Sequence, residues 1–373
     1  MTTPDPIRVL FVTPRCWPDT GGVETHVVQV ARRLASAGAV AMVLTTDLSG
    51  RLPVEEQIEG VTIRRARAWP AHRDYYFAPG IYRAITRGDW DIVHVQSYHT
   101  LVAPLAMFAA LRARLPYVVT FHGGGHSSRV RNGLRGAQRA MLRPLLARAE
   151  RLIAVAPFEV KFFATRLRLP PQRFVVIPNG SDLPRVAHPA AVANGTLIAS
   201  VGRLERYKGH HRVIEALPKV LEQKPDAHVW IAGTGPYEPE LRRLADRLGV
   251  ADRVEIRAVP AEDRQAMASA LSRAALVVLL SEYETHPIAV LEAIRLKRPV
   301  LVARTSGLSE LADRGLARAI PIDSTTEQVA LAVLEQLRQP LVPAKVDLPS
   351  WDDCASDLLA LYRSIVRERR CAS

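Results

Sequence analysis

Four charged side chains in the second half of the chain have types and spacings that suit a phosphorylated ligand. Arg203 and Lys208 follow one short apolar segment, and Glu284 and Glu292 follow another. Arg presents a planar fork of donors and Lys a compact point charge, and both bind phosphate groups. Carboxylates accept hydrogen bonds from hydroxyl groups. Two cations and two carboxylates therefore predict a site for an elongated ligand that carries a diphosphate and hydroxyls.

The residues between the two glutamates predict the start of a helix. Thr285 is a residue type that caps helices, and Pro287 is a type favoured in the first helical turn. The free backbone N–H groups of a helix start bind anions. We therefore expect the diphosphate at this helix start and the hydroxyl pair of a ribose on one of the carboxylates. The predicted ligand contacts here are Thr285, His286, Pro287 and Ile288.

Glycine and histidine follow other apolar segments. Gly21 and Gly22 stand between an apolar segment and a helical one, where glycine lets a backbone approach a phosphate. Gly233 has a similar place in the second half. His122 precedes three glycines, which suits a hydrogen bond to a sugar hydroxyl or help in activating an acceptor. Each feature also fits an ordinary turn or a core histidine, so it gains weight only as part of the set.

The elements that must position these residues alternate along the whole chain. Short apolar runs are followed by longer segments of helical spacing, which predicts strands buried on both faces of parallel sheets. We therefore predict an α/β fold with two doubly wound, Rossmann-like domains, whose ligands bind at the carboxyl ends of the strands, in a central cleft. The predicted strands are 7–12, 40–45, 61–65, 92–95, 117–121, 152–155, 174–177, 197–201, 228–231, 254–256, 276–280 and 300–302.

A segment rich in Pro and Ala, 182–195, separates two such series and predicts a linker. The expected domains are 1–183 and 195–350. A final helix, 351–369 within the terminal segment 351–373, has apolar positions at helical spacing.

The net charge of +13 is concentrated in the first half of the chain. Residues 1–185 contain 25 Lys and Arg against 13 Asp and Glu, whereas residues 186–373 contain 25 against 24. This excess of positive charge attracts an anionic membrane or an acidic acceptor. Within it, arginines recur every four residues at Arg131, Arg135, Arg139 and Arg143. Arg outnumbers Lys 44 to 6, so coding bias is the competing explanation. With 6% aromatic residues and no recognition motif, a nucleic-acid binder is not expected.

Three scattered cysteines fit a reducing compartment and form no metal-ligand spacing. No apolar run approaches the roughly 20 residues that span a bilayer, and no signal peptide is evident. We therefore expect a cytoplasmic protein, with peripheral association at a membrane as the alternative.

In their order and spacing, these segments resemble the retaining glycosyltransferases of the GT-B fold, specifically glycosyltransferase family 4, the group 1 glycosyltransferases. The family's two glutamates, seven residues apart, match Glu284 and Glu292, and its Arg and Lys match Arg203 and Lys208. The resemblance spans residue 7 to about 311, plus the terminal helix. The other matches are Gly21-Gly22, His122-Gly123 and Pro178-Asn179-Gly180.

The resemblance implies a hexosyltransferase that takes a sugar from a nucleotide-diphosphate sugar, UDP-sugar before GDP-sugar, and retains the anomeric configuration. It implies Arg203 and Lys208 on the diphosphate, Glu292 on the ribose, Glu284 by the donor sugar and His122 between donor sugar and acceptor. The first domain would bind a glycan, a lipid-linked acceptor or a small-molecule natural product, and the terminal helix would pack on that domain. No metal or other cofactor is implied, and no Asp-x-Asp pair stands where a metal-bound diphosphate would need one.

Two positions depart from the family pattern. Many members have Gly directly after the first glutamate, where this chain has Thr285 and then His286, and many have Gly near Ala258. The donor sugar and the base are therefore left open. Two other functions stay as alternatives: a sugar-nucleotide epimerase on the same fold, and a sugar-nucleotide binder without catalysis. The cations paired with two glutamates favour transfer.

Overall fold

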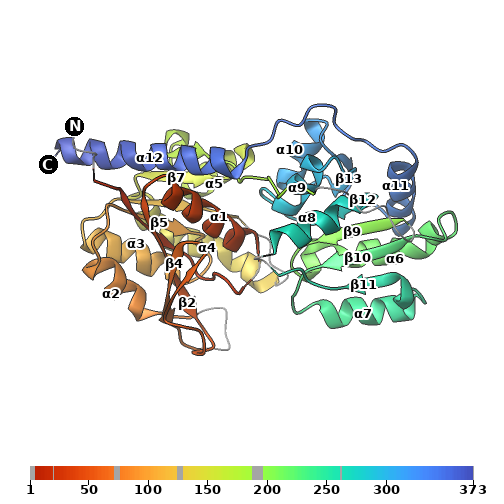
Figure 1. Cartoon of the computed structure of the whole chain (residues 1–373), viewed down its shortest axis with the longest axis horizontal. Helices are drawn as coiled ribbons and strands as arrows, with labels where there is room; N and C mark the ends of the chain where they lie inside the picture. The colour runs from red at the N-terminus through yellow and green to blue at the C-terminus, as the bar shows by residue number, and fades with distance from the viewer. Residues whose placement is uncertain are drawn as a thin grey trace. The chain divides into compact units, whose positions relative to one another are not determined.

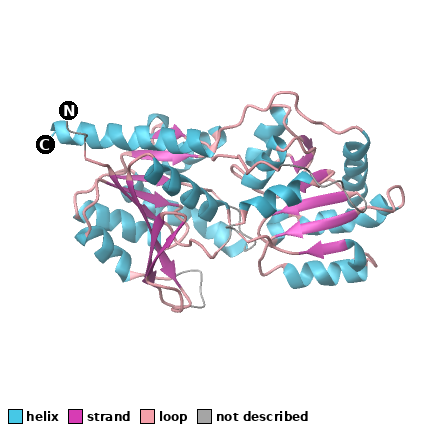
Figure 2. Ribbon diagram, in the orientation of Figure 1, coloured by secondary structure: helices cyan, strands magenta, loops and turns pink. Residues whose placement is uncertain are grey.

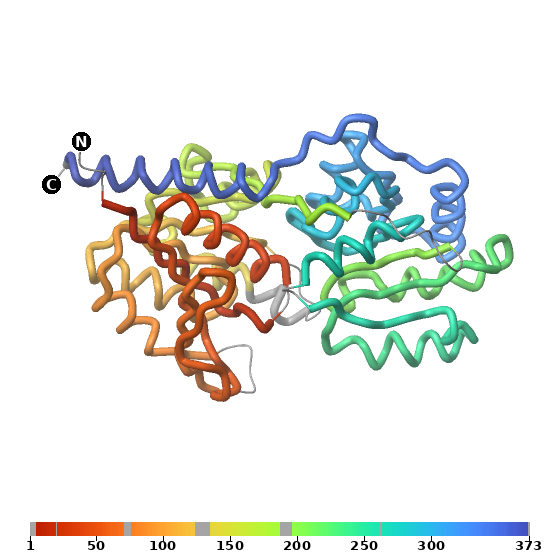
Figure 3. The backbone as a smooth tube through the Cα atoms, in the orientation of Figure 1, coloured from red at the N-terminus to blue at the C-terminus, as the bar shows by residue number. Residues whose placement is uncertain are grey.

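The computed structural model describes residues 5–19, 21–70, 76–123, 129–186, 196–260 and 263–372, and in the helix Arg129–Leu146 it describes side chains from Arg135 onward. The chain folds as two compact units (Figures 1 and 3). The first unit consists of Met1–Gly123, Gly133–Gly180 and Pro349–Ser373, and the second is built mainly from Ser181–Leu348. Thr20, the residues Gly124 to His126 and most of the predicted linker, 187–195, lie outside the described residues.

The first unit contains an eight-stranded sheet of order β3-β4-β2-β1-β5-β6-β7-β8. Figure 2 shows strands in magenta and helices in cyan. All neighbours are parallel except β3, which pairs antiparallel with β4. The parallel strands follow chain order outward from β1 in both directions, as in a doubly wound sheet. The strands are β1 (Arg8–Val12), β2 (Val40–Asp47), β3 (Glu55–Ile58), β4 (Val61–Arg67), β5 (Ile92–Gln96), β6 (Tyr117–Thr120), β7 (Arg151–Ala154) and β8 (Phe174–Val176).

The two faces of this sheet have different coverings. One face forms an apolar core with α2 (Pro79–Arg87), α3 (Val102–Arg112), α4 (Arg129–Leu146) and α5 (Pro157–Leu167). On the other face, α1 (Gly22–Ser36) and α12 (Trp351–Ala372) lie side by side (Figure 1). Here α12 contacts the sheet through Tyr362, which lies against Phe11 and His94.

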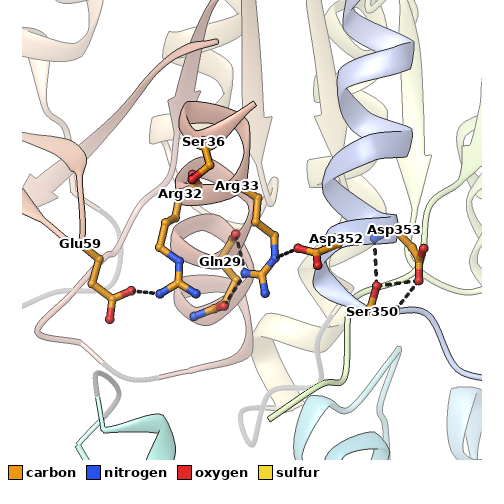
Figure 4. A network of polar contacts seen from close by, with 8 residues as sticks. All are labelled: Gln29, Arg32, Arg33, Ser36, Glu59, Ser350, Asp352 and Asp353. Carbon is orange, nitrogen blue, oxygen red and sulfur yellow. Dashed lines mark hydrogen bonds and ion pairs between the residues drawn. The ribbon is translucent and has the colours of Figure 1, made fainter. Parts of the chain in front are cut away.

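Polar contacts fix the start of α12 on α1 (Figure 4). Arg33 Nε donates to Asp352 Oδ1 at 2.5 Å, and the Arg33 guanidinium also bonds to Gln29 Oε1. The backbone of Trp351 comes so close to Gly180 that a Cβ there would lie 2.4 Å from the Trp351 nitrogen. A side chain at position 180 would therefore push α12 away.

The second unit contains a parallel six-stranded sheet of order β11-β10-β9-β12-β13-β14. Successive residues of its strands face opposite cores: Val278 of β12 packs with α6, α7 and α11, and Val277 with α8, α9 and α10. The strands are β9 (Leu197–Val201), β10 (His228–Ala232), β11 (Val254–Ile256), β12 (Leu276–Leu279), β13 (Val300–Ala303) and β14 (Arg318–Ile320). The helices are α6 (His210–Leu221), α7 (Glu238–Arg247), α8 (Arg264–Ser272), α9 (Ile288–Arg295), α10 (Ser306–Asp313) and α11 (Thr326–Arg338).

The prediction of an α/β protein with two doubly wound parallel sheets is confirmed. Two strands were not predicted, the edge strands β3 and β14. Within the described ranges, no helix is both long and apolar enough to cross a membrane.

Candidate active site

Four predicted site residues of the second unit lie at one edge of its sheet. Because parallel strands share an orientation, their carboxyl ends meet at one edge. Arg203 follows β9, Gly233 follows β10 and Glu284 follows β12. Lys208 ends a single helical turn, Arg206–Lys208, between β9 and α6.

The structure joins two of these residues directly. Lys208 Nζ donates to Glu284 Oε1 at 2.5 Å, and the two side chains are only 15% and 9% exposed. Burial alone would lower the pKa of the Lys208 ammonium, but the Glu284 carboxylate outweighs burial and leaves that pKa above its usual value. Lys208 therefore stays charged, and this cation lies beside an acceptor oxygen of Glu284.

The backbone of Glu284 is held by the loop that follows β13. The Glu284 N–H donates to Ser306 Oγ at 2.8 Å, and the Gly307 N–H donates to the Glu284 carbonyl at 2.9 Å. Thr305 Oγ1 donates to the Ser281 carbonyl at 2.8 Å. These contacts from the end of β13 and the start of α10 were not predicted, although Thr305, Ser306 and Gly307 follow closely after a buried strand.

Arg203 lies on an exposed turn, and a buried side chain contacts the backbone of that turn. Its guanidinium donates to the Tyr207 hydroxyl at 3.0 Å, and its carbonyl lies 3.2 Å from His210 Nε2. Burial lowers the pKa of His210 to about 4, and its other ring nitrogen lies 2.8 Å from Ser200 Oγ. A neutral His210 with the proton on Nε2 donates to the Arg203 carbonyl and accepts from Ser200. This bracing histidine was not predicted.

The glycines of this edge bring backbones together. A Cβ on Gly233 would lie 1.9 Å from the Gly202 carbonyl oxygen. Gly209 has φ +76°, and a Cβ there would lie 2.2 Å from the Leu280 carbonyl oxygen. These contacts give the glycines a packing role, and the predicted ligand contact of Gly233 stays a prediction.

Glu292 is buried in α9, with only 2% of the residue exposed. Its carboxylate pairs with Nη2 of Arg264, from α8, a partner that no sequence motif indicated. Burial raises the pKa of Glu292 to about 7, while the Arg264 charge opposes the rise and Asp182 adds to it. The carboxylate of Glu292 is thus available to accept hydrogen bonds at neutral to basic pH.

The start of α9 differs from the prediction. The helix begins at Ile288, and Pro287 is its N-cap residue with no side-chain capping bond. The predicted cap by Thr285 and the position of Pro287 in the first turn are therefore wrong, because ψ of Pro287 is 103°, outside the helical range. Thr285 and His286 are half-buried beside this start, and their ligand contacts stay predictions.

In the first unit, His122 follows β6 in a strained backbone conformation, with φ +42°. Its Nε2 lies 2.6 Å from Gln96 Oε1, and its ring packs edge-on against His26 with 4.8 Å between ring centres. Burial lowers the pKa of His122 well below its usual value, and the nearby rings of His26, His94 and His99 lower it further. His122 is therefore neutral over the physiological pH range.

Gly21 and Gly22 lie where α1 begins, as predicted for a strand-to-helix turn. A Cβ on Gly21 would lie 2.3 Å from Glu24 Oε2, so the bare backbone makes room for that carboxylate. Within the ranges the structure describes, no three His, Cys, Asp or Glu side chains converge as metal ligands do.

Two family models match the chain. The model of Glycosyltransferase Family 4 matches residues 20–185, and the model of Glycosyl transferases group 1 matches residues 188–346. The chain belongs to the group 1 glycosyltransferases.

Relatives of this glycosyltransferase include the D-inositol 3-phosphate glycosyltransferase of Nocardiopsis dassonvillei, 28% identical over 94% of this chain and 91% of that protein. The GDP-mannose:cellobiosyl-diphosphopolyprenol alpha-mannosyltransferase of Xanthomonas oryzae is 29% identical over 77% of this chain and 76% of that protein.

Solved structures share the fold. Sucrose-phosphate synthase of Thermosynechococcus elongatus has a TM-score of 0.76 at 19% identity, covering 97% of this chain and 100% of that one. Anabaena HepE in complex with UDP and glucose has a TM-score of 0.72 at 18% identity, covering 98% of this chain and 100% of that one. The predicted GT-B fold of this glycosyltransferase is confirmed.

Proposed function

We propose that this glycosyltransferase moves a hexose from a nucleoside diphosphate sugar to a hydroxyl group, with UDP as the favoured nucleotide and GDP as the next candidate. The observation that carries the proposal is the buried Lys208–Glu284 pair, with Arg203 in the same segment between β9 and α6. HepE was solved with UDP and glucose, which supports UDP, and the name of the Xanthomonas relative, which begins with GDP-mannose, supports GDP.

The cations serve the leaving group. When the bond from the anomeric carbon to the β-phosphate oxygen breaks, negative charge grows on the diphosphate. Arg203 and Lys208 are already in place to stabilise that charge, so they need no reorganisation during the reaction. Preorganised electrostatic stabilisation of this kind makes the largest single contribution to lowering the activation barrier. The proposed reaction is therefore metal-independent and needs no cofactor. On binding the donor, Lys208 shares its ammonium between Glu284 and the diphosphate.

The remaining donor contacts come from α9 and from the residues just before it. Glu292 accepts hydrogen bonds from the ribose hydroxyls, for which a mostly ionised carboxylate is available above pH 7. The backbone at Thr285, His286, Pro287 and Ile288 faces the diphosphate. Glu284 holds hydroxyls of the donor sugar through its carboxylate, whose Oε1 accepts from both Lys208 Nζ and Ser281 Oγ.

The first unit is proposed to bind the acceptor, with His122 beside its hydroxyl. The Gly21-Gly22 turn is proposed to let the backbone approach a phosphate of the donor. The relatives' names refer to an inositol phosphate and a diphosphopolyprenol, which supports a hydroxylated acceptor that carries phosphate. The excess of basic residues in the first half of the chain attracts such an anion. An anionic membrane surface is the rival partner, and salt-sensitive flotation with anionic liposomes would distinguish it.

We propose transfer with retention by front-face substitution. The acceptor oxygen bonds to the anomeric carbon on the side that the diphosphate leaves, and the hydroxyl proton passes to the departing phosphate oxygen. No carboxylate of the first unit matches a nucleophile motif, which favours this route over a covalent intermediate. The three free cysteines support a reducing, cytoplasmic setting.

The test follows nucleoside diphosphate release from UDP- and GDP-sugars with hydroxylated acceptors, EDTA present, and the anomeric configuration of the product by proton NMR. Release with retained configuration supports the proposal. Interconversion of the donor sugar without release would indicate the epimerase, and binding without either would indicate a non-catalytic binder. Lys208→Ala should lose activity, whereas Lys219→Ala, which removes an exposed lysine of α6, should keep it.

A further inference from the structure

A ladder of polar side chains follows one face of the first sheet and ends at His122. His94 and Gln96 are two residues apart on β5, so they point to the same face. His94 Nδ1 lies 2.5 Å from the Tyr362 hydroxyl, and His94 Nε2 lies 2.7 Å from Thr120 Oγ1. One step further along β5, Gln96 Oε1 lies 2.6 Å from His122 Nε2. The last contact of the ladder thus joins a buried carboxamide to the predicted active-site histidine.

The contact with Gln96 determines which ring nitrogen of His122 carries the proton. A carboxamide oxygen accepts and never donates, so His122 Nε2 must be the donor. A neutral imidazole has one N–H group, and Nδ1 is therefore left with a lone pair. Among the described residues, no hydrogen bond reaches Nδ1 of His122.

Two further features keep the ring in this orientation. His26 of α1, only 2% exposed, packs edge-on against it with an interplanar angle of 70°. The backbone of His122, at φ +42°, lies in a region that few non-glycine residues adopt. Gln96 itself is 1% exposed and belongs to the end of a central strand. Three features therefore fix the orientation of the imidazole: the hydrogen bond to Gln96, the contact with the ring of His26, and the backbone conformation of His122 itself.

We propose that Gln96 is a positioning residue that holds His122 as the Nε2–H tautomer, so that Nδ1 accepts a hydrogen bond from a hydroxyl of the sugar ligand. The assignment of the ligand rests on the proposed function, but the tautomer does not. His122 then orients a hydroxyl oxygen through that hydroxyl's own proton. If the Gln96 carboxamide were turned over, its own Nε2 would face the His122 ring and donate to Nε2 of His122. The proton of His122 would then lie on Nδ1, and Nδ1 could not accept a hydrogen bond from a ligand.

The tautomer can be measured on the full chain. Long-range proton–nitrogen NMR on protein with labelled histidines distinguishes the two tautomers, and a His122→Phe variant identifies the signals of His122 among 11 histidines. We expect the Nε2–H tautomer in the wild type and a mixture in Gln96→Leu. The Nδ1–H tautomer in the wild type would overturn the proposal. Gln336→Leu is the matched control, because Gln336 is also fully buried but belongs to the second unit.

Kinetics separate positioning from a structural role. Gln96→Leu should lower kcat/KM of transfer roughly tenfold, the value of one hydrogen bond, with UDP affinity unchanged. Gln96→Glu should restore most of the rate at high pH and move the acid limb of the pH profile upward by at least one unit, since a carboxylate favours the imidazolium. If Gln96→Leu lowers the Tm as Gln336→Leu does, but leaves tautomer and pH profile unchanged, Gln96 is only structural and the proposal fails. A changed tautomer in a protein that never transfers sugar would refute the proposed function instead.

Discussion

Replacing Glu292 with Gln should change how the stability of the second unit depends on pH. Glu292 is 2% exposed, and burial raises the pKa of its carboxyl to about 7. A Glu side chain in an unfolded chain titrates near ~4.3. Because the folded state holds the proton more tightly, the free energy of unfolding falls as the pH rises from about 4.3 to about 7.

The size of this effect follows from the pKa alone. A carboxyl that titrates at about 7 when folded and ~4.3 when unfolded contributes a change of roughly 2–3 kcal/mol between pH 5 and pH 8. Glu292→Gln has no titrating group at this position. Its free energy of unfolding, measured relative to the wild type, should therefore rise by roughly 2–3 kcal/mol over that interval. The loss of charge next to Arg264 shifts the whole curve but not its slope.

Urea unfolding at pH 5, 6, 7 and 8, followed by circular dichroism, measures this slope. Glu327→Gln, which removes an exposed carboxylate of α11, is the control and should run parallel to the wild type. If Glu292→Gln also runs parallel to the wild type, then Glu292 titrates normally and the argument from burial is wrong. The same variant should bind UDP more weakly, because the carboxylate that lowers the stability of the fold at neutral pH is the group proposed to bind the ribose hydroxyls.

Other perturbations have distinct expected outcomes. Glu284→Gln should lower transfer on the order of 100-fold while the chain stays folded, with a lower Tm because the buried Lys208 ammonium loses its counterion; near-normal turnover would contradict its placement. Lys208→Ala leaves a buried carboxylate unpaired, so the free energy of unfolding should fall by roughly 3–5 kcal/mol in urea titrations. Burial lowers the pKa of His26 and of His210 to about 4, so between pH 6.5 and pH 4 these histidines bind protons in the unfolded chain but not in the folded one. The free energy of unfolding should therefore fall as the pH drops from about 6.5 to about 4. A free energy of unfolding that stays constant over this range would show that the two histidines are not held neutral. Arg33→Ala should cost under about 1 kcal/mol, because Asp352 is 82% exposed, whereas Trp351→Ala should cost roughly 3–5 kcal/mol.

The fold could be predicted because most strands are continuous apolar runs. The β1 segment, Arg8–Val12, and the β12 segment, Leu276–Leu279, are buried on both faces, and such runs are typical of parallel sheets. The missed strands lack this pattern. β3 reads Glu-Glu-Gln-Ile at a sheet edge, and β14 is three half-buried residues, so neither carries an apolar signal.

The site could be predicted in its residues but not in its partners. Strand ends converge by topology, and this brings Lys208 to Glu284 across 76 positions. The choice of Arg264 for Glu292 and of Ser306 for Glu284 depends on how helices and loops pack, which no local spacing encodes. Gln96 was a missed clue, since a polar residue in a buried strand end needs a partner.

Calorimetric titration with UDP, GDP, ADP and TDP in the presence of EDTA tests the central claim most directly. We expect that one nucleoside diphosphate, UDP first, binds without metal, and that Arg203→Ala and Lys208→Ala each weaken its binding at least tenfold while Lys219→Ala does not. Binding that requires a divalent metal, or no binding of any of the four, would show that the proposed donor site is wrong.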